Sequence, residues 1–114
     1  MMTFGRDIVV PRDGSMADTL YERLAEHINE ATSALEVGES LQLDWFNSSG
    51  ECIRVEDIGY HNPNLIKLYG RDNSNRKCTV LVHMNALELV LRVNDSASRQ
   101  SRRIGFVGES ATRN

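Results

Sequence analysis

The sequence predicts an α+β fold in which an N-terminal amphipathic helix is followed by a five-strand antiparallel meander. Three observations lead to this prediction. Apolar residues recur at helical spacing over residues 16–36, the period changes to two from Ser40 onwards, and turn-forming clusters separate the later apolar runs. One helix covers only one face of such a sheet. We therefore expect the sheet to curl, or to close into a small barrel.

The chain has 114 residues, which is the size of one domain. Its net charge of −3 gives no global attraction to nucleic acid. No run approaches the roughly 18 apolar residues of a membrane span, so we expect a cytoplasmic protein. Because no signal peptide is evident, Cys52 and Cys78 are expected to be free thiols rather than a disulfide.

The helix is predicted to run from about Met16 to Glu36. Ser15 and Asp18 have the spacing of a capping box, and Gly38 is a natural stop after the last turn. Steps of three and four residues place one apolar stripe on the helix, formed by Leu20, Leu24, Ile28, Ala31 and Leu35.

The strands follow the helix in regular order. Residues 40–46 and 52–58 read as a hairpin, and residues 65–71 read as the third strand. The most apolar stretch, Lys77–Val93, is predicted to hold the fourth and fifth strands, divided near Asn85. A helix after Asn85 is the alternative, because the leucines there also fit a helical face.

The stretch Lys77–Val93 carries apolar residues on both faces. Its second face includes Leu81 and Val90. Its main apolar rows are Cys78, Val80, Val82 and Met84 in the first half and Leu87, Leu89, Leu91 and Val93 in the second. This is more apolar surface than one helix covers, so we expect a homodimer or a higher oligomer.

We divide the chain into three parts. Residues 1–14 are predicted to form an arm, and residues 15–93 form the helix-and-sheet domain. Residues 94–114 are predicted to be a polar linker and tail rich in arginine and serine, with a short apolar island at residues 104–108.

Two cysteines and two histidines supply the ligand types that zinc prefers, so a metal site is one candidate. Cys52, His61, Cys78 and His83 match no common zinc spacing, and Cys78 and His83 have opposite parity on one strand. We therefore expect Cys52 and Cys78 to be small buried residues and the histidines to lie at edges or in loops, with no metal and no cofactor.

Acid–base catalysis is the next candidate, with Asp44, Glu56, Asp57 and His61 as its residues. Such chemistry needs a shaped pocket that shifts pKa values, and a small meander offers little concavity. We expect Asp44 and Glu56 to lie on the solvated face of the first hairpin. Together with the absence of any nucleophile elbow or phosphate loop, this predicts a non-enzymatic protein.

Basic residues near strands raise the possibility of RNA binding. Arg71, Arg76 and Lys77 surround one turn, beside Tyr69. The order of a helix and five short strands resembles that of Sm-like barrels, which bind RNA as rings. That family uses a basic residue and a glycine at the turn between its last two strands, whereas this turn, residues 83–86, has neither. The resemblance implies an Sm-like RNA-binding barrel as the alternative function.

Protein binding is the leading prediction. Aromatic residues near exposed edges are typical interface anchors, and only 6% of this chain is aromatic. Trp45 is expected to lie in the core. The residues predicted to contact a partner are Tyr21, Glu22, Ala25, Asn29, Tyr60 and Phe106.

The size and element order of the chain resemble those of the QslA-type antiactivators of bacterial quorum sensing. The resemblance implies a non-enzymatic dimer that binds a LuxR-type transcription factor and blocks its dimerisation. Such a protein silences the regulator without touching DNA. We therefore expect a small regulatory protein that inhibits its partner by occluding a dimerisation surface.

Overall fold

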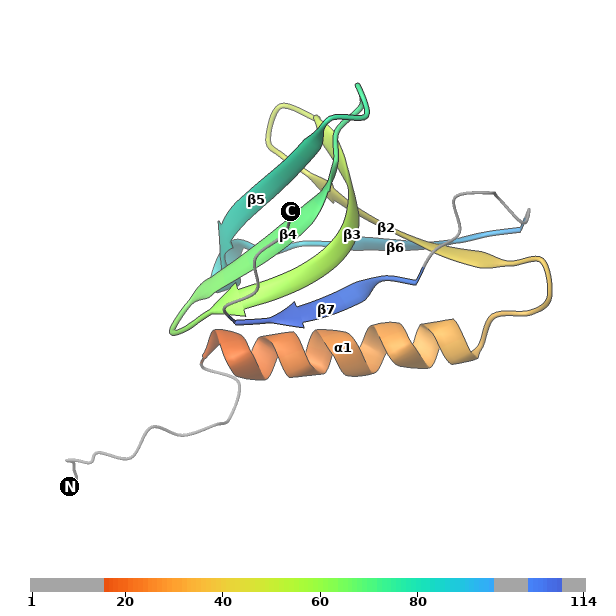
Figure 1. Ribbon diagram of the computed structural model, residues 1–114, viewed down its shortest axis with the longest axis horizontal. Helices are drawn as coiled ribbons and strands as arrows, with labels where there is room; N and C mark the ends of the chain where they lie inside the picture. The colour runs from red at the N-terminus through yellow and green to blue at the C-terminus, as the bar shows by residue number, and fades with distance from the viewer. Residues whose placement is uncertain (1–15, 96–102, 110–114) are drawn as a thin grey trace.

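One helix and six strands make up the part of the chain that the computed structural model describes, residues 16–95 and 103–109 (Figure 1). The α+β class predicted from the sequence is confirmed. The elements are α1 (Ala17–Ser33), β2 (Ser40–Phe46), β3 (Cys52–His61), β4 (Leu65–Arg71), β5 (Lys77–His83), the short 3₁₀ helix η1 (Met84–Ala86), β6 (Val90–Asn94) and β7 (Gly105–Gly108).

The strands form one curled sheet that does not close into a barrel. Its order is β5-β4-β3-β2-β6, with all of these neighbours antiparallel, and β7 pairs in parallel with β3. The predicted meander therefore holds from β2 to β5. The next strand, β6, crosses to the far edge and pairs with β2, while β7 is a sixth strand that the sequence did not reveal.

The central strand β3 organises the sheet. On one side it pairs with β4, and on the other it pairs first with β2, up to Val55, and then with β7 from Asp57. A register shift between Val55 and Asp57 inserts one extra residue in β3. This bulge keeps Val55 and Ile58 on the same face, because they oppose Gly70 and Leu68 of β4.

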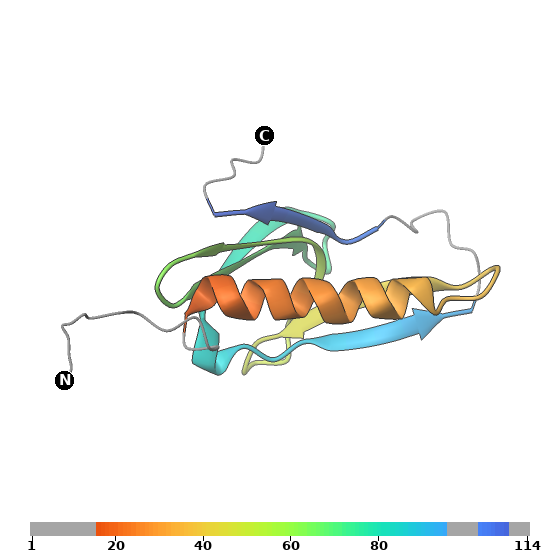
Figure 2. The ribbon, with the colours of Figure 1, turned by 90° about the horizontal axis from the view of Figure 1, so that it is seen from below.

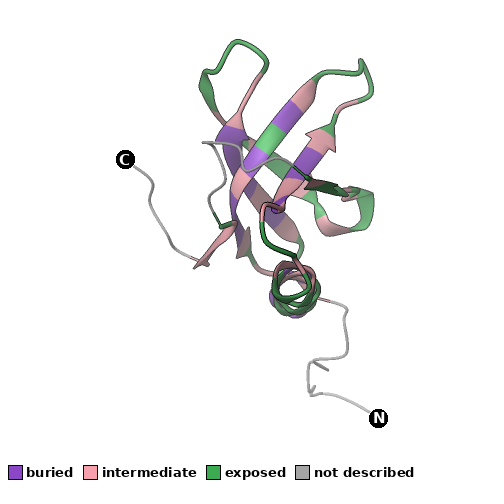
Figure 3. Ribbon diagram, turned by 90° about the vertical axis from the view of Figure 1, so that its right-hand side faces the viewer, coloured by how far each residue is buried: buried purple, intermediate pink, exposed green. Residues whose placement is uncertain are grey.

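The hydrophobic core lies between α1 and the helix-facing side of the sheet. Figure 3 shows the buried segments gathered on the inner strands and the exposed segments on the outer side of α1. The fully packed members of the core are Ala17, Ile28, Leu43, Val55, Ile58, Ile66 and Leu68. Trp45, which the sequence places in the core, is half-buried and packs against this cluster.

The N-terminus of α1 is capped by a distant loop rather than by its own sequence. The helix begins after Met16, whose side chain makes no capping hydrogen bond, and Ser15 lies outside the described residues. The Ala17 N–H donates to the Pro63 carbonyl at 2.8 Å, and the Asp18 N–H donates to Asn62 Oδ1 at 3.0 Å. The β3–β4 loop thus satisfies donors that a helix start leaves free.

The stretch Lys77–Val93 holds two strands, as predicted, but they do not form a hairpin. On β5, Val80 and Val82 face the core. The η1 turn then redirects the chain, and the His83 side chain accepts a hydrogen bond from the Asn85 N–H at 3.1 Å. Residues 90–94 form strand rather than helix and pair with β2.

The structure describes only part of the two terminal regions predicted from the sequence. The arm, residues 1–14, lies outside the described residues. Of residues 94–114, the apolar island contributes β7 to the sheet. Among the residues that the structure describes, no helix has both the length and the apolar character needed to cross a membrane.

Candidate protein-interaction surface

Only part of the predicted helix flank lies on the exposed surface of α1. Glu22 and Asn29 are exposed, while Ala25 is half-buried. Glu22, Glu26 and Glu30 follow one another at four-residue steps and are all exposed, so they share one acidic face. This face favours a partner surface that carries basic residues, and its contact with a partner stays a prediction.

The three predicted aromatic anchors lie together. The Tyr21 and Tyr60 ring centroids are 4.8 Å apart, and Tyr21 meets Phe106 edge-on at 5.8 Å. The Tyr21 hydroxyl accepts a hydrogen bond from the Gly108 N–H at 3.0 Å. Burial, followed by the nearby negative charge of Glu109, raises the pKa of Tyr60. The cluster therefore joins α1, β3 and β7, and the half-exposed rings present only part of their surface to a partner.

Strand β6 exposes three large apolar residues at one edge of the sheet. Val90, Leu91 and Val93 are 37%, 40% and 55% exposed, although Leu91 and Val93 oppose Leu43 and Leu41 in register. We call these three residues the β6 edge. The other outer strand, β5, exposes one large apolar residue, Leu81. The sequence predicts that Leu81 and Val90 lie on the second face, but it places Leu91 and Val93 in a main apolar row, so their exposure is unexpected.

An ion pair between the buried Asp44 and the partly exposed Arg92 attaches β6 to β2. The Asp44 carboxylate is almost completely buried and accepts hydrogen bonds from Arg92 at 2.5 Å and from Gln42 at 2.8 Å. The Arg92 guanidinium also lies 5.8 Å from the centre of the Phe46 ring. The expectation that Asp44 lies on a solvated face is therefore wrong, because β6 covers that part of the hairpin.

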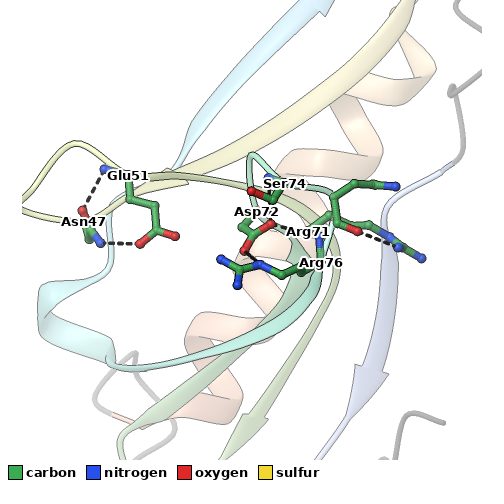
Figure 4. A network of polar contacts seen from close by, with 7 residues as sticks. Asn47, Glu51, Arg71, Asp72, Ser74 and Arg76 are labelled. Atoms are coloured by element: carbon green, nitrogen blue, oxygen red, sulfur yellow. Dashed lines mark hydrogen bonds and ion pairs between the residues drawn. The ribbon is translucent and has the colours of Figure 1, made fainter.

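A cavity of about 570 Å³ opens where β2 separates from β3. Its lining mixes carboxylates, guanidinium groups and apolar side chains, including Asp44, Arg54, Glu56 and Ile104. Beside it, the β4–β5 turn is held by Asp72, which accepts hydrogen bonds from Ser74 and Arg76 (Figure 4). The Asp72 carboxylate and the Arg76 guanidinium are thus occupied in contacts within the turn.

Neither thiol near these elements is activated for nucleophilic chemistry. Burial raises the pKa of Cys52, and the negative charge of Asp44 raises it further. Burial also raises the pKa of Cys78, with a further contribution from Asp72. Since the thiolate is the reactive form, both residues remain protonated thiols near neutral pH.

The four residues considered for zinc do not come together. His61 and His83 both oppose Leu65, from the strands on its two sides. Cys52 lies at the start of β3, and Cys78 faces the core from β5 opposite Gly70. Across residues 16–95 and 103–109, no group of three or more histidine, cysteine or acidic side chains is arranged to hold a metal ion.

A comparison of the chain with known protein families, with characterised proteins and with solved structures finds no match.

Proposed function

We propose that this chain is a non-enzymatic regulatory protein that binds another protein through the β6 edge. The observation that carries the proposal is the exposure of Val90, Leu91 and Val93 on an outer strand of the sheet. An outer strand presents unpaired backbone groups along its free side, and apolar side chains there gain free energy when another chain covers them. The β6 edge is therefore suited to accept a strand from a partner.

The position of β6 supports this choice of surface. Leu91 and Val93 continue the core rows that begin at Leu43 and Leu41, so an added strand extends the same apolar layer. The ion pair between Arg92 and the buried Asp44 holds β6 in place, which limits the ordering that binding must supply. The exposed acidic face of α1 adds a charged surface that selects among apolar partners.

The mechanism we propose is occlusion. The partner normally forms a dimer through an apolar strand or helix. The β6 edge binds this dimerisation surface instead, so the active dimer of the partner does not form. The resemblance to QslA-type antiactivators makes a LuxR-type transcription factor in the cytoplasm the candidate partner. The predicted contact residues on the helix, Tyr21, Glu22, Ala25 and Asn29, belong to the same proposal.

In the absence of a partner, we propose that a second copy covers the β6 edge. Two β6 strands that pair around a twofold axis continue the sheet and bury Leu91 and Val93 of both copies. The measurement is the solution mass at tens of micromolar. A strict monomer at that concentration overturns the homodimer.

The main test is capture of the partner by the full chain and by two variants. Val93→Lys places a charge on the β6 edge, and Val37→Lys makes the same change at a fully exposed apolar residue outside the sheet. We expect the wild type and Val37→Lys to capture one specific protein, and Val93→Lys to lose it. The captured protein, produced alone, should be a dimer that the wild-type chain converts to a mixed complex.

RNA binding remains the second candidate, supported by the arginines on the outer side of the sheet. Arg54 lies in register with both Asp44 and Arg71, and Arg92 contacts Asp44, so these guanidinium groups share one face. Their affinity for single-stranded RNA is expected to fall steeply as salt is raised. Strong, salt-dependent RNA binding without capture of a protein contradicts the occlusion proposal.

A further inference from the structure

The cavity where β2 separates from β3 is large enough for a small organic molecule. Its volume of about 570 Å³ lies within the roughly 300–1,000 Å³ that is typical of ligand sites. One part of its lining is charged and includes Arg54 of β3 and Arg71 of β4. Another part is apolar and includes Leu41 of β2 and Ile104, the residue that precedes β7. A ligand that fits both parts needs a charged group and an apolar body.

The three carboxylates that line the cavity each lie beside a guanidinium group. The pairs are Asp44 with Arg92 (2.5 Å), Glu56 with Arg71 (3.6 Å) and Asp72 with Arg76 (2.9 Å). Figure 4 shows the last of these pairs, within the β4–β5 turn. The negative charge of the lining is therefore balanced within the protein, and a cationic ligand finds no free carboxylate there.

The positive charge of the lining is not balanced in the same way. Arg54 forms no ion pair and no hydrogen bond through its side chain with any residue in 16–95 or 103–109. Asp44 lies directly opposite Arg54 in register, but this carboxylate is almost completely buried and is held by Arg92. Arg54 is exposed, so its guanidinium group is left free to bind an anion.

Arg54 also lies directly opposite the like charge of Arg71 in the β3–β4 ladder. Like charges in this position destabilise a sheet, and an anion bound between them relieves the repulsion. Guanidinium groups bind carboxylates and phosphates through parallel N–H donors. Arg71 retains donors for this purpose, because Glu56 and the Asn75 carbonyl occupy only part of its five N–H groups.

We infer that the cavity between β2 and β3 is a binding site for a small organic anion, in which Arg54 and Arg71 bind a carboxylate or phosphate group and Leu41 and Ile104 contact an apolar body. Two arginines suit either kind of anionic group, so both are tested. The site uses none of the three residues of the β6 edge, and the inference does not rest on the proposed capture of a protein.

The test is a titration of the full chain followed through the nuclear magnetic resonance signals of its backbone amides, at constant ionic strength. The probes are benzoate and phenyl phosphate, and the controls are acetate and inorganic phosphate, which lack the apolar ring. We expect benzoate, phenyl phosphate or both to bind saturably, with the largest shifts around Arg54 and Arg71. The ring should strengthen binding at least about tenfold over the matching bare anion, since it covers apolar surface.

Two matched variants test the role of the free guanidinium group. Arg54→Met removes the unpaired charge and keeps an unbranched side chain, and should weaken binding at least about tenfold. Arg23→Met makes the same change at an exposed residue of α1 and should bind like the wild type. Circular dichroism and thermal unfolding establish that both variants are folded.

The inference is overturned if neither benzoate nor phenyl phosphate gives saturable shifts up to about 10 mM. Equal weakening by Arg54→Met and Arg23→Met also overturns it, because it indicates non-specific attraction to the surface. Bare anions that bind as tightly as the aromatic ones exclude the apolar body. Binding of single-stranded RNA without either aromatic anion assigns the arginines to RNA instead. Partner capture through the β6 edge, which Val93→Lys reports, is a separate result that Arg54→Met should leave unchanged.

Discussion

The two sides of α1 differ in how the chain covers its apolar surface. On one side, β7 completes the sheet and the rings of Tyr21, Tyr60 and Phe106 pack together. On the other, β6 is the outer strand and leaves Leu91 and Val93 exposed (Figure 2). One free edge of β3 is thus covered by β7 of the same chain, whereas no described strand covers the outer side of β6. An uncovered strand edge is a potential site of association.

The largest expected effect is the difference in stability lost when a residue on each side of α1 is replaced by alanine. Ile58 is fully buried opposite Phe106 and Leu68, so Ile58→Ala should lower the free energy of unfolding by about 2–5 kcal/mol. At protein concentrations too low for two copies to pair, Val93→Ala should lower it by less than about 0.5 kcal/mol, because Val93 is exposed in the single chain. Urea unfolding measures both values. A similar loss for Val93→Ala would mean that the β6 edge is covered in solution.

The next effect concerns the attachment of β6. Arg92→Leu leaves the buried Asp44 carboxylate without its charged partner, and should cost about 1–3 kcal/mol of stability. Arg76→Leu breaks an exposed pair with Asp72 and should cost no more than about 1 kcal/mol. Thermal unfolding of the two variants compares them. Equal losses would indicate that the Asp44–Arg92 pair does not hold β6.

A smaller effect is expected on the closed side. Tyr21→Phe removes the acceptor for the Gly108 N–H and should weaken the packing of β7 by about 0.5–1.5 kcal/mol. Hydrogen exchange resolved by residue measures it, with faster exchange expected at Gly108. Amides of β4 that pair with β5 serve as the internal control and should be unchanged. Unchanged exchange at Gly108 would mean that the hydrogen bond to the Tyr21 hydroxyl does not stabilise β7.

The smallest effect lies in the β4–β5 turn, which belongs to neither side. The Arg76 backbone N–H donates to Asp72 and lowers the pKa of this carboxyl below its ordinary value of 3.8. A lowered folded-state pKa adds stability above about pH 4, and this is lost as the pH falls through the folded value. Asp72→Asn should therefore lose less stability than the wild type between pH 7 and pH 3. Urea midpoints at both pH values measure it, and parallel losses would contradict the assignment.

Much of the secondary structure could be predicted from local patterns. The apolar stripe of α1 and the alternation along β5 place Ile28, Val80 and Val82 on their buried sides, as the structure has them. The candidate site was harder to predict. The sequence predicts Tyr21, Tyr60 and Phe106 as separate aromatic anchors, and only the packing of α1 and β7 on β3 brings them into one cluster.

The sequence by itself determined the α+β class, the helix and the core-facing row of β5, because a period of 3.6 or of two acts within one element. Tertiary structure alone decided four further features. They are the capping of α1 by Asn62, the burial of Asp44, the pairing of β6 with β2 and the pairing of β7 with β3. Each joins residues far apart in the chain. Periodicity specifies which face of a strand is buried, whereas the identity of its neighbour depends on how the whole sheet curls.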